Sequence, residues 1–107
     1  MKATSKEGKH MIVLIAKYHT KQGNVPKVLE ELKKMKPLVQ ASEPGCKFYQ
    51  VSRSTENENL IVLYEHYVDQ AALAAHRDTA HFKAIIEGTV IPLLEKRERE
   101  LYELAIS

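Results

Sequence analysis

The chain has 107 residues, of which 44% are hydrophobic and 28% charged, and its formal net charge is +2 at pH 7. This length suits one small domain with a modest core. Charges that are nearly balanced and scattered along the chain argue against nucleic acid as a partner. Cys46 is the only cysteine, which excludes an internal disulfide and suits a reducing compartment. We therefore expect a cytoplasmic protein.

The first residues, MKATSKEGKH, are polar and contain no apolar stretch of the kind that a secretory signal needs. The longest apolar run, MIVLIA, is far too short to cross a bilayer, so no membrane partner is expected. We predict a disordered polar N-terminus over residues 1–9 and one folded domain over residues 10–107.

A strand is predicted over residues 10–20, because this segment is rich in β-branched residues and is followed by KQGN. Asn24 is a suitable cap for the helix that follows, and Pro26 lies in its first turn, where a missing N–H is tolerated. Apolar residues then recur at helical spacing until SEPG ends the helix, namely Val28, Leu29, Leu32, Met35 and Val39.

Two further strands are predicted over residues 46–55 and 60–68, joined by the turn ENEN as an antiparallel hairpin. Asp69 is a good cap for a short alanine-rich helix that runs to about His76. Asp78 or Thr79 is expected to cap a second helix, which Gly88 and Pro92 end or kink. The apolar side of that helix consists of Phe82, Ile85, Ile86, Val90, Leu93 and Leu94.

A closing strand is expected in RERELYELAIS, where Tyr102, Leu104 and Ile106 occupy alternate positions. The order β-α-β-β-α-β then indicates an α+β fold, the ferredoxin-like split βαβ, with a four-stranded antiparallel sheet and helices on one face. Each central strand is apolar on both sides: the first has Val13 and Ile15 against Ile12, Leu14 and Ala16, and the third has Val62 and Tyr64 against Ile61 and Leu63. Since helices cover only one face, we expect a homodimer that pairs through the other.

Three stretches of the chain are similar to one known family. EPGCKFYQVSRS, IVLYEHYVDQAALAAHRDTAHFK and PLLEKRERELYEL resemble the antibiotic biosynthesis monooxygenase (ABM) family over about residues 11–106. The most specific part is E-x-aromatic, then A-L-x-x-H, then H-F-K. The resemblance implies a dimeric α+β barrel and, from the best-known members, oxidation of quinols or phenols by dioxygen without metal, flavin or haem.

The chain also departs from the family pattern. Strand three usually reads E-x-Trp, whereas this chain has Glu65, His66 and Tyr67 and no tryptophan. Ala16 occupies the position, aligned by the following Gly23, where haem-degrading relatives carry asparagine. Two of that subgroup's three pocket residues are therefore missing, so we expect no haem degradation. The resemblance still implies a small aromatic or quinone-like substrate, dioxygen as co-substrate and no cofactor.

His76 and His81 are the candidate catalytic residues. Cofactor-free oxygenation needs a base that removes a phenolic proton, and histidine is suited to that task near neutral pH. His76 follows Leu73 by three residues and should face the sheet, although a core-edge histidine bonded to the backbone is the alternative. His81 lies in the first turn of the next helix, where the positive helix end favours a neutral imidazole. It is alternatively a partly exposed residue with local hydrogen bonds.

Tyr67, Glu65, Tyr49, Phe82 and Ala16 are the candidate substrate-binding residues. Tyr67 and Glu65 are two apart on one strand and share a face, where Tyr67 would stack on a planar substrate or donate a hydrogen bond. For Glu65 we favour an ion pair with lysine or arginine, because a carboxylate is rarely buried without a partner. Either Tyr49 or Phe48 faces the pocket, and the sequence leaves that choice open.

A metal site is not expected. Five residues of continuous helix separate two side chains by about 140°, and no third ligand is evident beside His76 and His81. Cys46 is interpreted as a packed small residue rather than a reactive thiol. We therefore predict a cofactor-free monooxygenase acting on a small quinol or phenol. An isomerase on the same scaffold and a non-catalytic dimeric ligand-binding or stress-response module are the alternatives, because a fold does not fix the chemistry.

Overall fold

The computed structural model describes residues 11–107, so the predicted disordered segment 1–9 lies outside the described residues. The elements follow the predicted order, with a short helical continuation before the last strand. They are β1 (Ile12–Thr20), α2 (Val25–Ser42), β2 (Cys46–Arg53), β3 (Leu60–Tyr67), α3 (Gln70–Arg77), η1 (Phe82–Val90), η2 (Ile91–Leu93) and β4 (Leu94–Glu103).

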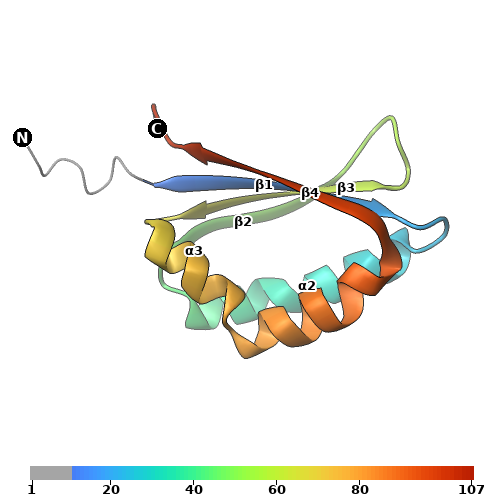
Figure 1. Cartoon of the computed structure of the whole chain (residues 1–107), viewed down its shortest axis with the longest axis horizontal. Helices are drawn as coiled ribbons and strands as arrows, with labels where there is room; N and C mark the ends of the chain where they lie inside the picture. The colour runs from blue at the N-terminus through green and yellow to red at the C-terminus, as the bar shows by residue number, and fades with distance from the viewer. Residues whose placement is uncertain (1–10) are drawn as a thin grey trace, which may run out of the picture.

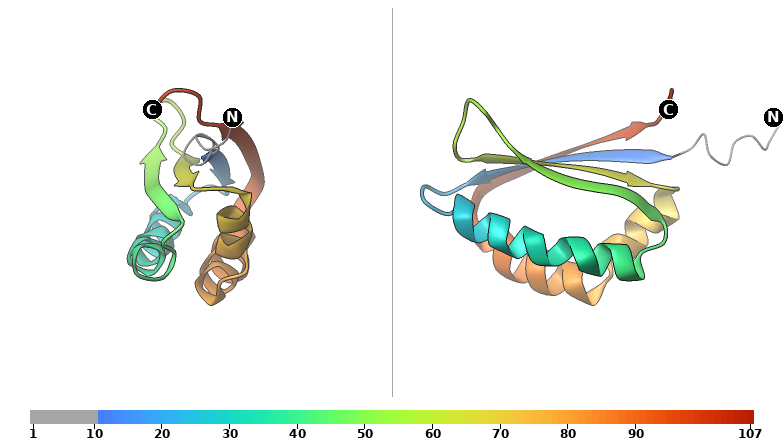
Figure 2. Two further views of the ribbon diagram at one scale, coloured as in Figure 1. Left: turned by 90° about the vertical axis from the view of Figure 1, so that its left-hand side faces the viewer. Right: turned by 180° about the vertical axis from the view of Figure 1, so that it is seen from behind.

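The four strands form one antiparallel sheet in the order β2-β3-β1-β4. All the helices lie on one face of this sheet (Figure 1). Seen from the end, α2 lies on the β2 side and η1 on the β4 side (Figure 2). The α+β ferredoxin-like fold predicted from the sequence is therefore confirmed.

The core fills the space between the sheet and the helices. The predicted apolar stripe of α2 is buried, with Val28, Leu32 and Met35 at most 1% exposed. It packs in one cluster with Ile61 and Leu63 on the helix-facing side of β3. The buried residues of η1, which are Phe82, Ile86 and Val90, belong to the same cluster. A smaller cluster beneath α3 consists of Ile12, Leu14, Tyr67 and Leu73.

Several local predictions need correction. The Asn24 side chain does not cap α2; it donates instead to the Leu93 carbonyl at 3.2 Å, which ties α2 to η2. Gly88 does not end the second helix, because η1 continues as a π-helix through Val90, and Pro92 lies in the short turn η2. The closing strand begins earlier than predicted, at Leu94, and ends at Glu103, which leaves Ile106 exposed.

Other predicted caps are confirmed. The Asp69 carboxylate accepts from the Ala72 N–H at 2.8 Å and begins α3. Of the two residues proposed to cap the next helix, Thr79 does so, since its Oγ1 accepts from the Phe82 N–H at 3.1 Å. No helix within residues 11–107 is long and apolar enough to cross a membrane.

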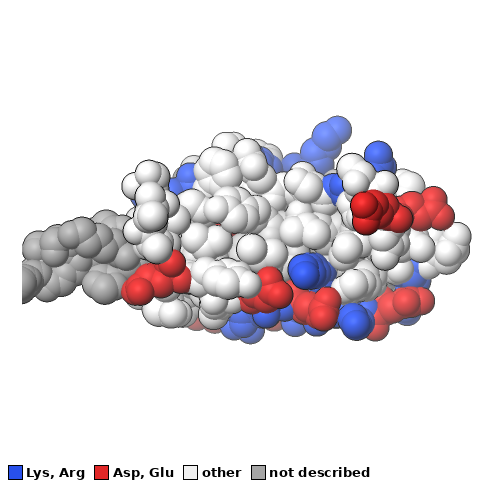
Figure 3. Space-filling view, turned by 90° about the horizontal axis from the view of Figure 1, so that it is seen from above, with Lys and Arg blue, Asp and Glu red and all other residues white. Residues whose placement is uncertain are grey.

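No element within residues 11–107 covers the face of the sheet away from the helices. Uncharged residues occupy much of this face, and charged side chains lie mainly toward its margins (Figure 3). Phe48, Tyr64 and Tyr102 expose 40%, 36% and 51% of their surface there. Phe48 and Tyr64 form an edge-to-face pair with ring centroids 5.8 Å apart. We call Phe48, Tyr64 and Tyr102 the open-face aromatics.

Candidate active site

His76 lies in the interior, between α3 and the sheet. It is on the same side of α3 as buried Leu73, as the helical spacing predicts, and is only 3% exposed. Its ring is surrounded by aromatic rings, with centroid separations of 5.1 Å to Phe82, 5.3 Å to Tyr67 and 6.2 Å to Tyr49. His76 is therefore a buried imidazole within an aromatic cage, not a residue at the helix surface.

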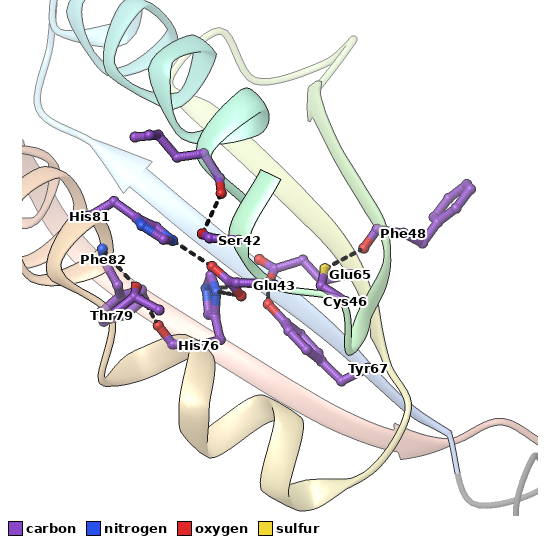
Figure 4. Close-up of polar contacts among 11 residues, drawn as sticks. Ser42, Glu43, Cys46, Phe48, Glu65, Tyr67, His76, Thr79, His81 and Phe82 are labelled. Atoms are coloured by element: carbon purple, nitrogen blue, oxygen red, sulfur yellow. Dashed lines mark hydrogen bonds and ion pairs between the residues drawn. The ribbon is translucent and has the colours of Figure 1, made fainter. Parts of the chain in front are cut away.

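Glu43 connects the two candidate histidines. It follows the last residue of α2, and its Oε1 and Oε2 accept from His76 Nδ1 at 2.7 Å and from His81 Nε2 at 2.6 Å (Figure 4). Gly45, two residues further along, makes this possible, because a Cβ at that position would lie 2.6 Å from the Ala72 Cβ on α3. A side chain there would hold the loop carrying Glu43 away from the helix carrying His76.

The bond to Glu43 fixes which nitrogen of His76 carries the proton. A carboxylate only accepts, so Nδ1 is the protonated nitrogen and Nε2 holds the free lone pair. Among residues 11–107, the nearest charged partner of Nε2 is Glu65 Oε1 at 3.9 Å, which is beyond hydrogen-bond distance. His76 thus keeps a basic nitrogen without a hydrogen-bond partner in the described part of the chain. Its pKa is lowered by burial, which outweighs the opposing effect of Glu43.

Glu65 lies on β3 at the same site, and the predicted ion pair with lysine or arginine is wrong. Its Oε1 instead accepts from the Tyr67 hydroxyl, two residues along the strand (Figure 4). Burial raises the pKa of Glu65 from 4.5 to about 7, with Glu43 adding to the rise and the Tyr67 hydrogen bond opposing it. A carboxyl with such a pKa is present in both protonation states near neutral pH.

A small cavity opens beside His76 and Glu65. Its volume is about 40 Å³, which is room for about one water molecule and far below the ~300 Å³ of a small ligand pocket. The enclosed chamber expected for a flat substrate is therefore not present in this conformation. The lining residues are Leu14, Ala16, Tyr18, Tyr49, Glu65, His76, Arg77, Phe82, Ile86, Arg97 and Arg99.

The cavity contains some of the predicted binding residues and not others. Tyr49, Glu65, Phe82 and Ala16 line it together with His76. Tyr67 and His81 do not; they reach the site through Glu65 and Glu43, to which they donate hydrogen bonds. Tyr49 rather than Phe48 faces inward, since Phe48 lies on the open face of the sheet.

Sequence reasoning missed Glu43, Tyr18 and three arginines of the lining. A signal for Glu43 was available, because an acidic residue directly after a helix is disfavoured by the helix dipole unless it has partners. Arg97 and Arg99 alternate along RERE, which predicts a shared face. Burial raises the pKa of Tyr18 and Tyr49, so both hydroxyls stay protonated and can donate.

Neither metal binding nor thiol chemistry gains support from the described residues. Within residues 11–107 no three His, Cys, Asp or Glu side chains are grouped in a way that could hold a metal ion. Burial raises the pKa of the Cys46 thiol to about 11. The thiolate is therefore scarce at neutral pH, as expected of a packed residue rather than a nucleophile.

Comparisons with known proteins agree with this fold. Solved structures with the same fold include a conserved protein from Methanosarcina mazei (25% identity, TM-score 0.81, covering 94% of this chain and 98% of that one). A protein of unknown function from Bacteroides thetaiotaomicron, suggested to be an oxidoreductase, shares 26% identity (TM-score 0.81, coverage 90% and 99%). A protein from Nitrosomonas europaea, provisionally named an antibiotic biosynthesis monooxygenase, also shares 26% identity (TM-score 0.84, coverage 90% and 91%).

The comparison with curated proteins finds no match. The family model described as "Antibiotic biosynthesis monooxygenase" matches residues 11–88, which is well over half of the chain and includes Glu43, Glu65, His76 and His81. The chain therefore belongs to the antibiotic biosynthesis monooxygenase family.

Proposed function

We propose that the protein is a cofactor-independent monooxygenase that oxidises a small quinol or phenol with dioxygen, using His76 as the general base. The observation that carries this proposal is a buried imidazole whose Nε2 has no hydrogen-bond partner among residues 11–107, and which lines a cavity with aromatic and apolar side chains, Glu65 and three arginines. Such a nitrogen is suited to remove a proton from a substrate hydroxyl.

Glu43 supports the proton transfer in the same way as an acidic residue behind a catalytic histidine. When Nε2 takes the substrate proton, the imidazolium charge is stabilised by the carboxylate 2.7 Å from Nδ1. The resulting phenolate then passes an electron to dioxygen more readily than the neutral phenol does. One oxygen atom enters the ring, the other leaves as water, and a hydroquinone becomes a hydroxyquinone.

The small volume of the cavity requires that side chains move when a ring enters. Tyr18, Tyr49 and His76 form the inner part and are at most 4% exposed, so they are held by packing. Arg77, Arg97 and Arg99 line the cavity but are exposed. Rotation of these exposed side chains is the change that opens the site at the least cost in packing.

We further propose that the protein is a homodimer whose open sheet faces pack together. The open-face aromatics support this, since exposed aromatic clusters of this kind mark interaction sites. A second copy of the same face is complementary in polarity and closes an isologous dimer.

Oxygen uptake tests the proposed reaction. Purified protein treated with a chelator should consume dioxygen with members of a hydroquinone panel, and isotopically labelled dioxygen should place one labelled atom in the product. His76→Asn keeps an amide N–H that can donate to Glu43 but lacks Nε2, and should lower kcat at least tenfold. His19→Asn is the matched control, because His19 pairs with Glu98 at the far end of β1. A His76→Asn variant that is folded and as fast as the wild type would show that His76 is structural.

An isomerase is the second candidate, and one observation favours it. His76 Nε2 and Glu65 Oε1 face the same cavity 3.9 Å apart, and the raised pKa of Glu65 allows it to give or take a proton near pH 7. Two such groups can move a proton between neighbouring carbons of a carbonyl compound. Exchange of substrate protons with deuterated solvent, without oxygen uptake, would favour this candidate; binding without turnover would favour a ligand-binding module.

A further inference from the structure

Three arginines meet at the outer part of the cavity. Arg97 and Arg99 lie on β4 directly opposite Tyr18 and Ala16 of β1, so their side chains lie on the helix-covered face with those residues. Arg77 is the last residue of α3 and follows His76. All three line the cavity that His76 and Glu65 share.

Among the described residues these positive charges are only partly balanced, by Glu65 of the same lining, which attracts Arg99. Within residues 11–107, the ion pairs of the fold involve lysines and histidines, and none includes Arg77, Arg97 or Arg99. Partial burial lowers the pKa of Arg99, and the nearby Arg77 and Arg97 lower it further against the opposing effects of Glu65 and Tyr18. Such a concentration of positive charge beside a cavity attracts an anion.

The rest of the lining indicates what kind of anion fits. The inner end offers the Tyr18 and Tyr49 hydroxyls, Glu65 and His76 Nε2, which suit a substrate hydroxyl. Leu14, Phe82 and Ile86 form apolar walls for a ring. Guanidinium groups bind carboxylates through two parallel hydrogen bonds, which a lysine cannot reproduce.

We propose that the substrate of this site is an acidic phenol or quinol, whose carboxylate is bound by Arg97 and Arg99 with Arg77 beside them. The carboxylate remains at the mouth while the hydroxyl reaches His76. This inference rests on the proposed function for its ring and hydroxyl, while the preference for an anion is testable by binding alone.

Binding measured without oxygen tests the inference. Isothermal titration calorimetry under nitrogen should give a Kd at least tenfold lower for 2,5-dihydroxybenzoate than for hydroquinone, which differs only in lacking the carboxylate. The preference should shrink as salt is raised, because exposed charges are screened. The double variant Arg97→Gln, Arg99→Gln should lose the preference for 2,5-dihydroxybenzoate. The double variant Arg97→Lys, Arg99→Lys should retain part of this preference. Arg53→Gln removes the same charge from β2, beside a different surface, and should leave the preference unchanged.

The outcomes separate the two proposals. Equal affinity of the wild type for both compounds, or a preference that survives in the double Gln variant, overturns the anion site whatever the oxygen uptake. A preference for 2,5-dihydroxybenzoate that depends on the two arginines supports the site. If that preference is found while neither compound is oxidised, the anion site stands and the oxygenase proposal fails.

Discussion

Replacing Glu65 with glutamine should remove most of the loss in unfolding free energy that this buried carboxyl causes as the pH rises. Glu65 is 3% exposed, and burial raises its pKa from 4.5 to about 7. The folded protein therefore binds this proton more tightly than the unfolded chain does. Stability contributed by the neutral carboxyl is complete below pH 4.5 and is lost as the pH rises through about 7.

The size of the change in unfolding free energy follows from the shift in the pKa of Glu65. Each unit of pKa difference corresponds to about 1.4 kcal/mol, so the free energy of unfolding should fall by about 3 kcal/mol across this window because of Glu65 alone. Glutamine has nearly the same shape and can still accept from the Tyr67 hydroxyl, but it does not titrate. His76, whose pKa is lowered, acts in the opposite direction in both proteins and cancels in the comparison.

Urea unfolding at fixed protein concentration, measured from pH 5 to pH 9 for both proteins, gives the difference directly. The wild type should lose stability relative to Glu65→Gln as the pH rises, and the variant should be the more stable of the two above pH 8. A difference that stays constant within about 0.5 kcal/mol across the range, which is the usual error of such comparisons, would refute the raised pKa.

Three further predictions follow from other parts of the structure. Gly45→Ala should cost about 1–3 kcal/mol of unfolding free energy in a thermal or urea melt, because its Cβ would overlap the Ala72 Cβ; an unchanged melt would show that the loop does not press on α3. Tyr64→Glu should convert the proposed dimer to monomer in light scattering, whereas Leu38→Glu, a similarly exposed site on α2, should not; a monomeric wild type would contradict the proposed sheet-face dimer. In a profile of kcat/KM against pH, the rise on the acid side should report deprotonation of His76. Its midpoint should lie below 6.5, because burial lowers the pKa of His76. A midpoint above 6.5 would assign this rise to another group.

The fold could be predicted from the sequence because its signals are local and agree with one another. The helical stripe around Val28 and Met35, the cap at Asp69 and the turn between β2 and β3 each specify one element. The prediction for Asn24 was wrong because a tertiary partner, the Leu93 carbonyl, competes for its side chain. The helix over η1 was predicted, but its π-helical form was not, because apolar spacing alone does not distinguish an α-helix from the rare π-helix.

The candidate site was predictable only in part. His76 and Glu65 belong to elements whose faces can be assigned from spacing. Glu43, by contrast, reaches His76 from 33 residues away, through a close approach at Gly45 that no local pattern reveals. The cavity volume also depends on how side chains from six elements fill space, which the sequence does not specify.

Chemical rescue tests the role of the His76 imidazole most directly. In His76→Ala, oxygen uptake with the best quinol should fall at least tenfold and should recover when imidazole is added. The recovery should follow the concentration of neutral imidazole as the pH is raised, since only the unprotonated ring can take the substrate proton. A folded His76→Ala protein that consumes dioxygen at the wild-type rate without imidazole would contradict the account.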